Sequence, residues 1–296
     1  MDHVLTLIAA PGGLTAEHTA AVRAALRALA ADVGSPDWLA EAEAADIPFG
    51  AIGADLSSAA ARRALGDAAV DAIAQPRAER RKRLLVADMD STIITSETLD
   101  ELAAYAGLKD KIAAITARSM NGELDFAEAL RLRVGMLKGL STEALERTWE
   151  ATALTPGAAT LVATMRADGA YCCLASGGFT FFTGRVAAQL GFDLHVSNTL
   201  EAEDGKLTGI VAEPIFDRDS KLETLKRLAA ERGLGLAATL AVGDGANDLA
   251  MIKAAGLGVA FRAKPVVAAA ARARVDHGDL TALLFAQGFR RAEFAA

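Results

Sequence analysis

From residue 84 onward, short apolar runs alternate with longer stretches in which apolar residues recur at helical spacing. The runs cover residues 84–87, 170–175, 238–242 and 257–261, and residues 274–276 complete the alternation. Apolar runs of this length predict buried strands, and strands that alternate with helices form a parallel sheet. The pattern therefore predicts an α/β fold with a Rossmann-like parallel sheet.

One long stretch, residues 98–149, has helical patterning and contains no segment that predicts a strand. It lies between the first predicted strand and the next one, where a parallel sheet places its ligand-binding loops. We therefore expect a helical cap over a site at the sheet, at about residues 95–152.

The first 76 residues have a different pattern. They predict a strand at 3–9, a helix at 15–31, one or two strands within 44–52 and a helix at 57–68. No cluster of catalytic side chains occurs there. Pro76 and the charged run at 77–83 mark a boundary, which predicts an α+β domain at 1–76 and a larger domain at 77–296.

Composition narrows the class of protein. The chain has 296 residues, 52% of them hydrophobic, and a formal net charge of −7. The basic run at 77–83 has the character of a solvated linker, so nucleic-acid binding is not expected. No apolar stretch reaches spanning length, and residues 1–3 lack the basic start of a signal peptide. These features predict no membrane association and a cytoplasmic location.

The two cysteines, Cys172 and Cys173, are adjacent within a predicted strand. Neighbouring residues of a strand point to opposite faces of the sheet. We therefore interpret them as small core residues and not as a disulfide or a metal-binding pair.

Two carboxylates, Asp88 and Asp90, follow the first predicted strand of the sheet. At the carboxyl end of a parallel strand they are accessible to a substrate. Asp88 could attack phosphorus as a nucleophile, and Asp90 could protonate the leaving oxygen. Acids this close favour a hard cation such as Mg2+ between them. The alternative is a simple Asp-Ser-Thr turn that caps the next helix.

A second acidic cluster, Asp244 and Asp248, follows the strand at 238–242 in the sequence Gly-Asp-Gly-Ala-Asn-Asp. Its glycines allow a tight turn, and the oxygen ligands required for a Ca2+ loop are absent. A second acidic strand end is what a shared divalent-ion site requires, although a plain turn is the alternative.

Two further elements bear on anion binding and on the surface of the fold. Ser176-Gly177-Gly178 follows the strand at 170–175 and precedes a helix, an arrangement that favours a phosphate, although such loops are common. A helix that begins near Arg218 carries Lys221. Residues 195–211 predict an exposed hairpin with its turn at 204–205, and His195 has no evident partner.

The ordered motifs D-M-D-S-T, S-G-G-F and G-D-G-A-N-D, with Lys221 between the last two, resemble the haloacid dehalogenase superfamily of phosphotransferases. In the cap, Glu97 and the segments 120–126 and 130–134 are similar to the substrate-binding elements of the phosphoserine phosphatase family within it. The resemblance covers about residues 84–284.

This resemblance implies hydrolysis of O-phospho-L-serine to L-serine and phosphate through an aspartyl-phosphate on Asp88, the last step of serine biosynthesis. Asp90 would exchange protons with the serine oxygen and then with water. Mg2+ would bind the carboxylates of Asp88 and Asp244 and the backbone carbonyl of Asp90, with Asp248 in support. The phosphoryl group would contact Ser176, Gly177, Lys221 and Asn247. Glu97 would bind the substrate ammonium and Arg133 its carboxylate, with Met120 and Phe126 as walls.

The N-terminal domain resembles the ACT-like regulatory domains. Pro11-Gly12 follows the first strand as a ligand loop does, but Ala10 stands where such domains often have an acid. A dimerising or structural role is therefore at least as consistent with the sequence as amino-acid sensing, and a homodimer through this domain is one possibility.

Two other functions fit parts of the pattern. One is a phosphatase of the same superfamily that acts on another small ester, such as phosphohomoserine or a sugar phosphate. The other is a signalling receiver phosphorylated on aspartate, which also places acids and a lysine at strand ends. Receivers have no cap inserted after the first acidic strand, so the stretch at 98–149 argues against this function.

Overall fold

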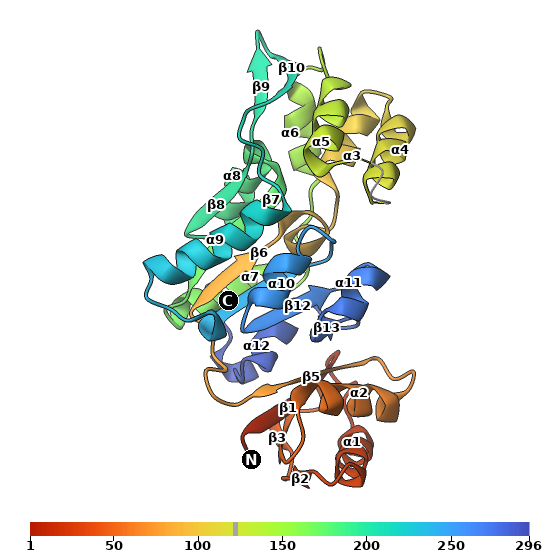
Figure 1. Cartoon of the computed structure of the whole chain (residues 1–296), viewed down its shortest axis with the longest axis vertical. Helices are drawn as coiled ribbons and strands as arrows, with labels where there is room; N and C mark the ends of the chain where they lie inside the picture. The colour runs from red at the N-terminus through yellow and green to blue at the C-terminus, as the bar shows by residue number, and fades with distance from the viewer. Residues whose placement is uncertain (121–123, 296) are drawn as a thin grey trace.

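The computed structural model describes residues 1–120 and 124–295. Figure 1 shows an antiparallel sheet at one end, a parallel sheet in the middle and a group of helices at the other end. Among the described residues, no helix combines the length and the apolar character needed to cross a bilayer.

The parallel sheet is six-stranded within the described residues, in the order β13-β12-β11-β6-β7-β8. Its strands are β6 (Leu84–Ala87), β7 (Tyr171–Phe179), β8 (Leu194–Asn198), β11 (Thr239–Gly243), β12 (Leu257–Phe261) and β13 (Ala273–Val275). This arrangement confirms the predicted α/β fold. Because β6 lies between β7 and β11, the residues that follow these three strands meet at one edge of the sheet.

Alternate residues of β6 pack into two different cores. Leu85 and Ala87 belong to one hydrophobic cluster, and Leu84 and Val86 to another. The helices around the sheet are α7 (Ala158–Ala167), α8 (Thr180–Leu190), α9 (Arg218–Glu231), α10 (Leu249–Ala254), α11 (Pro265–Ala270) and α12 (Ala282–Ala286). Because both faces are covered, β6 is apolar at every position, which is why its sequence predicted a buried strand.

The two cysteines follow the same rule. Cys172 packs in the first of these clusters and Cys173 in the second, and both are free and buried. The interpretation of the pair as small core residues on opposite faces is confirmed.

The inserted segment is helical where the structure describes it. A tight turn at Met89–Ile93 leads to the inserted helices. They are α3 (Thr98–Tyr105), α4 (Lys109–Met120), α5 (Phe126–Gly135) and α6 (Glu143–Ala151), which we call the cap helices. The chain enters and leaves this segment side by side, since Ile94 and Leu154 form an antiparallel bridge. Thr95 N donates to Ala153 O at 3.0 Å beside that bridge.

Residues 1–76, which we call the N-terminal module, form an antiparallel sheet with two helices. Its elements are β1 (His3–Ala9), β2 (Asp32–Val33), β3 (Asp37–Ala40), β4 (Ala44–Gly50), β5 (Val70–Pro76), α1 (Ala16–Ala28) and α2 (Ala54–Leu65). The strand order is β2-β4-β1-β5, and β3 also pairs with β4. β5 was not predicted, because Asp71 and Gln75 are buried in it and interrupt its apolar pattern.

The predicted hairpin at 195–211 was partly wrong. His195 belongs to β8, which pairs in parallel with β7, and its Nδ1 lies 3.1 Å from Thr183 Oγ1. The hairpin itself consists of β9 (Leu200–Glu203) and β10 (Lys206–Val211), with its turn at 204–205 as predicted. An edge strand such as β8 is partly exposed, so its sequence alternates as a hairpin strand does.

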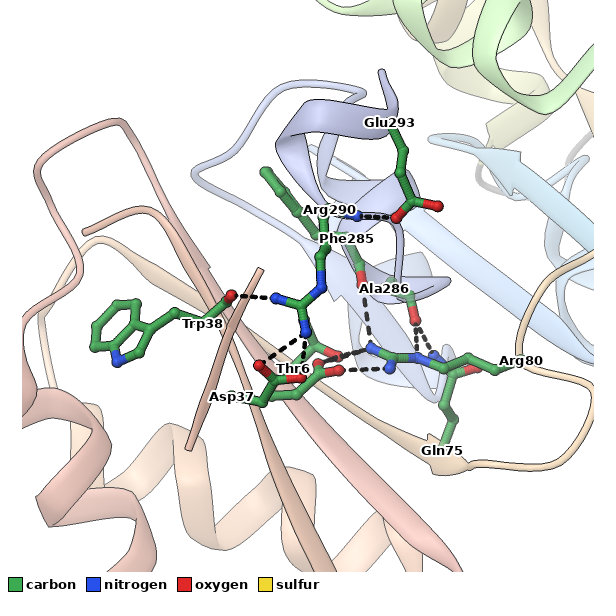
Figure 2. A network of polar contacts seen from close by, with 10 residues as sticks. Thr6, Asp37, Trp38, Gln75, Arg80, Phe285, Ala286, Arg290 and Glu293 are labelled. Carbon is green, nitrogen blue, oxygen red and sulfur yellow. Dashed lines mark hydrogen bonds and ion pairs between the residues drawn. The ribbon is translucent and has the colours of Figure 1, made fainter. Parts of the chain in front are cut away.

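The basic run at 77–83 is a solvated linker only in part, which corrects the expectation from its charge: residues 77–79 and 83 are exposed, but Arg80 and Lys82 are held by the fold. The Arg80 guanidinium donates from Nη2 to Asp46 at 2.7 Å and to Thr6 at 2.8 Å, and from Nε to Ala286 O at 2.8 Å (Figure 2). Lys82 is buried as well. Arg80 therefore links two strands of the N-terminal module to the C-terminal part of the chain.

A second contact joins the same two parts. The carboxylate of Asp71, in β5, accepts hydrogen bonds from the backbone N–H groups of Asp276, His277 and Gly278, the shortest at 2.7 Å. Burial raises the pKa of Asp71, and these three donors oppose that rise. The N-terminal module is thus attached through buried polar groups.

Candidate active site

A tight turn after β6 places the first two acids. Asp88 caps the turn, and its Oδ1 accepts from Met89 N at 2.8 Å. Ser91 adopts a left-handed backbone conformation, with φ of 53°, which reverses the chain within a few residues. Asp90 accepts from Thr98 N at 2.9 Å and from Ser176 Oγ at 3.3 Å. Asp90 therefore contacts both the cap and the end of β7.

Three carboxylates and one ammonium group meet at this edge of the sheet. Asp88, Asp244 and Asp248 each place an oxygen within 4.8 Å of the other two. Lys221 Nζ lies 2.7 Å from Asp88 Oδ1 and 2.6 Å from Asp248 Oδ1. The structure therefore brings together the acids predicted on β6 and β11 and the lysine predicted on a helix, now α9.

Burial and the neighbouring negative charges make Asp88 and Asp244 hard to ionise without a further cation. Burial, with Asp248 and Asp244 beside it, raises the pKa of Asp88 well above its usual value. Burial and Asp248 also raise the pKa of Asp244 to about 6. For Lys221, burial lowers the pKa, but Asp248 and Asp88 outweigh it and the pKa is raised. The site holds more negative than positive charge, as a divalent-cation site does.

The donor atoms suit a hard ion. Both oxygens of Asp248 already accept a hydrogen bond, Oδ1 from Lys221 and Oδ2 from Gly245 N at 2.9 Å. Asp244 Oδ1 accepts from Thr92 Oγ1 at 3.2 Å. Among the described residues, no protein donor is hydrogen-bonded to Asp88 Oδ2 or Asp244 Oδ2. Two free carboxylate oxygens in a buried acidic cluster are the ligands that Mg2+ prefers.

Glycines bring the loop after β11 close to the strand. A Cβ on Gly243 would lie 2.3 Å from Asp248 Cγ, so another residue there would displace the Asp248 carboxylate. A Cβ on Gly245 would lie 2.3 Å from Asn247 Oδ1, which shows that the Asn247 amide folds back over the loop. The glycines of this motif thus allow close approach as well as a tight turn.

Ser176, Gly177 and Gly178 lie within β7, one strand away from Asp88, and not in a turn beyond it as we expected. Gly178 N donates to Ser176 Oγ at 2.9 Å, which orients the hydroxyl that contacts Asp90. A Cβ on Gly178 would lie 2.7 Å from Asp90 Oδ2. The sequence placed Gly178 only in a phosphate-binding turn, and its close approach to Asp90 was not predicted, although a doubled glycine at a strand end is a signal for such an approach.

The cap presents Phe126 to the same edge. Phe126 is the first residue of α5, whose N-cap Asp125 accepts from Ala127 N at 2.9 Å. A Cβ on Gly177 would lie 3.2 Å from Phe126 Cζ, so the ring packs directly over the backbone of Gly177. These two predicted substrate-binding residues are therefore in contact.

Glu97 and Arg133 lie in the cap above the acids. Ser91 Oγ donates to Glu97 Oε1 at 2.7 Å. Arg133 Nη1 donates to Thr116 Oγ1 at 3.3 Å, and burial lowers the pKa of Arg133 against the opposing charges of Asp100 and Glu97. The sequence analysis assigned no role to Ser91 or Asp100, because their relevance depends on the turn after β6 and on the packing of α3.

Part of one predicted element cannot be placed. Met120 ends α4, but its side chain and residues 121–123 lie outside the described part of the chain. The other predicted residues, by contrast, are placed at one edge of the sheet or in the cap: Asp88, Asp90, Glu97, Phe126, Arg133, Ser176, Gly177, Lys221, Asp244, Asn247 and Asp248.

Comparison with known proteins gives a consistent result. The family model of the haloacid dehalogenase-like hydrolases matches residues 85–253. A phosphoserine phosphatase of Streptomyces coelicolor is 43% identical over 289 residues, which cover 96% of this chain and 70% of that protein. A phosphoserine phosphatase of Mycobacterium tuberculosis is 45% identical over 217 residues, but those residues cover only 53% of its length and 73% of this chain.

A solved structure matches nearly the whole chain, including the N-terminal module. The haloacid dehalogenase family hydrolase t0658 of Salmonella enterica serovar Typhi superposes with a TM-score of 0.82 at 30% identity, over 96% of this chain and 98% of that one. Together, the family model, the identities and this superposition establish that the chain belongs to the haloacid dehalogenase-like hydrolases, and among them to the phosphoserine phosphatase family.

Proposed function

We propose that this protein hydrolyses O-phospho-L-serine to L-serine and phosphate through an aspartyl-phosphate, as the last step of serine biosynthesis. The observation that carries the proposal is the buried ammonium of Lys221, which lies 2.7 Å from Asp88 and 2.6 Å from Asp248. A fixed positive charge beside a carboxylate nucleophile is suited to a phosphoryl group that moves between oxygens.

In this mechanism Asp88 attacks phosphorus, and Asp90 transfers protons. Burial, with Glu97 nearby, raises the pKa of Asp90 to about 7, so part of its population holds a proton at neutral pH. Asp90 gives this proton to the serine oxygen as the P–O bond breaks. The resulting carboxylate then accepts a proton from the water that hydrolyses the aspartyl-phosphate.

Mg2+ would be held by the carboxylates of Asp88 and Asp244 and by the backbone carbonyl of Asp90. When bound, it neutralises the phosphoryl oxygens and the two acids. The hydrogen bonds that Asp248 accepts from Lys221 and from Gly245 N support an indirect role for that residue, in which it orients Lys221 and the loop at Gly245.

We assign the phosphoryl oxygens to Ser176, Gly177, Lys221 and Asn247. The hydroxyl of Ser176 already lies 3.3 Å from Asp90 Oδ2, so a phosphoryl group bound there would be next to the proton donor. Lys221 contributes charge, and the backbone at Gly177 is free of a side chain that would block the approach.

The amino-acid end of the substrate would bind in the cap. Glu97 would bind the ammonium, and Arg133 would bind the carboxylate with its planar guanidinium. Phe126 excludes water from above Gly177, and the role of Met120 as a second wall is supported by the sequence pattern alone. A pocket with one acid, Glu97, and one base, Arg133, selects a zwitterionic substrate over a phosphate ester that lacks the ammonium and carboxylate groups.

The chemistry is tested by phosphate release from L-phosphoserine with Mg2+, with EDTA and in Asp88→Asn. We expect phosphate release only from the wild-type protein in the presence of Mg2+. Asp219→Asn, a change of an exposed acid on α9, is the matched control and should keep full activity. Activity that survives Asp88→Asn would contradict the covalent route, and a long-lived phospho-Asp88 without turnover would support the receiver hypothesis.

The substrate is tested by a panel of L-phosphoserine, D-phosphoserine, phosphothreonine and phosphohomoserine. Arg133→Ala should raise the KM for L-phosphoserine about a hundredfold, since it removes a charge-assisted bidentate contact. Arg227→Ala, which removes an exposed arginine paired with Glu231, should leave the KM unchanged. An unchanged KM in Arg133→Ala would show that the pocket is assigned wrongly.

We also propose a division into an ACT-like domain at 1–76 and a phosphatase domain at 77–296, with the cap at about 95–152. The free, buried cysteines suit a reducing compartment such as the cytoplasm.

Leu29 and Leu56 are exposed on the helical side of the N-terminal module, which supports dimerisation through that module. Light scattering of the purified protein, compared with a Leu29→Ser, Leu56→Ser variant, tests the dimer.

A further inference from the structure

The β9–β10 hairpin leaves the parallel sheet and lies against the cap. Gly139 N donates to Leu207 O and Leu207 N donates to Leu140 O, both at 2.8 Å. Thr142 N donates to Gly205 O at 2.9 Å. Figure 1 shows β9 and β10 at the same end of the molecule as α5 and α6. The hairpin and the loop after α5 therefore share a short backbone ladder.

Two glycines let the hairpin touch the end of α5 directly. Gly209 has a φ of +82°, and a Cβ there would lie 2.9 Å from Lys138 Cβ and 3.3 Å from Gly135 O. Gly135 is the last residue of α5. No side chain of either glycine separates the two backbones, so their relative position is closely constrained.

An ion pair adds a third contact between the same elements. Arg131 donates from Nη2 and Nε to Glu213 Oε1 at 2.7 and 3.1 Å. Arg131 is on α5, two residues before Arg133, and Glu213 follows β10 at the base of the hairpin. Glu213 Oε2 also accepts from Ile215 N at 3.2 Å, which holds the carboxylate against the backbone of its own segment.

We propose that the hairpin positions α5 over the active site, and that Gly209 and Glu213 are positioning residues for Phe126 and Arg133. α5 is a rigid rod of about 15 Å, with Phe126 at one end over Gly177 and Gly135 at the other end against the hairpin. A shift at the hairpin end therefore moves the substrate-facing residues. The expected change in KM for L-phosphoserine rests on the proposed function, but the expected change in the amide hydrogen exchange of α5 does not.

Other contacts between cap and core lie elsewhere. The chain passes between the core and the cap at the bridge between Ile94 and Leu154. In addition, Arg185 of α8 pairs with Glu146 of α6 at 2.8 Å. Neither contact involves α5. The hairpin is thus the part of the described core that holds the distal end of this helix.

The test compares Gly209→Ala with Gly205→Ala. Both glycines have positive φ, +82° and +74°, so both variants bear the same backbone strain, but a Cβ at Gly205 meets nothing within 4 Å. In Gly209→Ala we expect amide hydrogen exchange in α5 to accelerate about tenfold and the KM for L-phosphoserine to rise about tenfold. In Gly205→Ala both should stay within about twofold of wild type.

Acetyl phosphate separates positioning from chemistry. It lacks the amino-acid carboxylate that Arg133 on α5 would bind, so its hydrolysis by Gly209→Ala should match wild type. Equal exchange rates and equal KM values in the two glycine variants would overturn the proposal. If wild type does not hydrolyse L-phosphoserine, the proposed function fails, and the exchange comparison still decides the role of the hairpin.

A charge exchange provides a second test that does not depend on the glycines. Arg131→Glu and Glu213→Arg should each raise the KM for L-phosphoserine about threefold, a size that fits an exposed pair. The double variant should restore the wild-type KM, because the pair is rebuilt in reverse. Failure of the double variant to recover, with normal exchange in α5 for all three proteins, would also count against the proposal.

Discussion

Lys221 and Asp248 form an ion pair with 2.6 Å between nitrogen and oxygen, and neither side chain has any exposed surface. A buried pair gains little net stability over apolar residues, but the loss of one partner leaves a charge without compensation. In this protein the pair is also shared with Asp88. Lys221 therefore supplies positive charge that partly offsets Asp88 and Asp248, and its hydrogen bond fixes the Asp248 carboxylate in place.

Lys221→Met should lower the free energy of unfolding by about 3 kcal/mol at pH 8 in EDTA, because two buried carboxylates, Asp88 and Asp248, lose their counter-ion. The loss should be smaller at pH 5, where Asp88, whose pKa is raised well above its usual value, takes up a proton. Lys226→Met changes an exposed lysine of the same helix and should have little effect. Urea unfolding measures both, and equal stability of the two variants at pH 8 would contradict this account.

Mg2+ should stabilise the native chain and fail to stabilise Asp244→Asn. A ligand at a hundred times its Kd adds about 2.7 kcal/mol to the stability of the folded state, and Asp244 supplies one of the two free carboxylate oxygens. Thermal unfolding with and without Mg2+ reports binding independently of activity. Asp219→Asn should respond as wild type does, and a normal Mg2+ response in Asp244→Asn would remove this acid from the metal site.

The raised pKa of Asp90 should appear in the pH dependence of stability without metal. The folded protein keeps this proton up to about pH 7, whereas the unfolded chain releases it near 3.8. Because the folded state binds more protons in this window, stability falls as pH rises through it, by at most about 1.4 kcal/mol per pH unit. Asp90→Asn lacks this group and should fall less steeply.

Urea titrations of the metal-free proteins between pH 4 and 8 measure the difference. The difference in the free energy of unfolding between Asp90→Asn and wild type should shift in favour of Asp90→Asn up to about pH 7 and then level off. A gap that does not change with pH would show that Asp90 titrates normally. Asp193→Asn, at a different end of the sheet, serves as a control for acid removal in general.

Gly178→Ala should lower kcat about a hundredfold and change KM little. The added Cβ would lie 2.7 Å from Asp90 Oδ2 and 3.1 Å from Ser176 Oγ. It therefore displaces the carboxyl group of Asp90, the proton donor, by up to about 1 Å. Gly235→Ala, at a glycine with open space around it, should be active. Steady-state kinetics decide the matter, and a fully active Gly178→Ala would mean that Asp90 has room to move.

Arg80→Met should loosen the N-terminal module. Arg80 pairs with Asp46 and also binds the carbonyl groups of Phe285 and Ala286 (Figure 2). Its loss leaves Asp46 without a cation, and we expect a decrease of about 3 kcal/mol in the free energy of unfolding. Arg77→Met, an exposed change in the same run, should have no such effect. Residues 1–76 should also be cleaved faster by a protease in Arg80→Met, but not in Arg77→Met.

The fold was predictable wherever burial is uniform. β6 and β12 have the predicted bounds, because short runs covered on both faces contain only apolar residues. The strand β5 was missed because Asp71 and Gln75 are buried in it and satisfied by groups far away in sequence. Partners of this kind are created by folding and leave no local pattern.

The same contrast holds at the active site. The acids were predictable because Asp88 and Asp244 directly follow predicted strands, and the sheet order brings the strand ends together. The tight approach of Gly178 to Asp90 and the contact between Ser91 and Glu97 were not. Both depend on the left-handed turn at Ser91, which a serine rarely adopts and which its sequence does not signal.

The bridge between Ile94 and Leu154 has a consequence for how specificity can change. The cap helices join the rest of the chain at a single place, where the incoming and outgoing segments run next to each other. A graft that replaces the helices between these two residues with those of another hydrolase would have to match this junction, the hairpin, and the contacts that the cap helices make with Asp90, Gly177 and Arg185. The reaction chemistry, which resides in the sheet, would pass unchanged to a new range of phosphate esters.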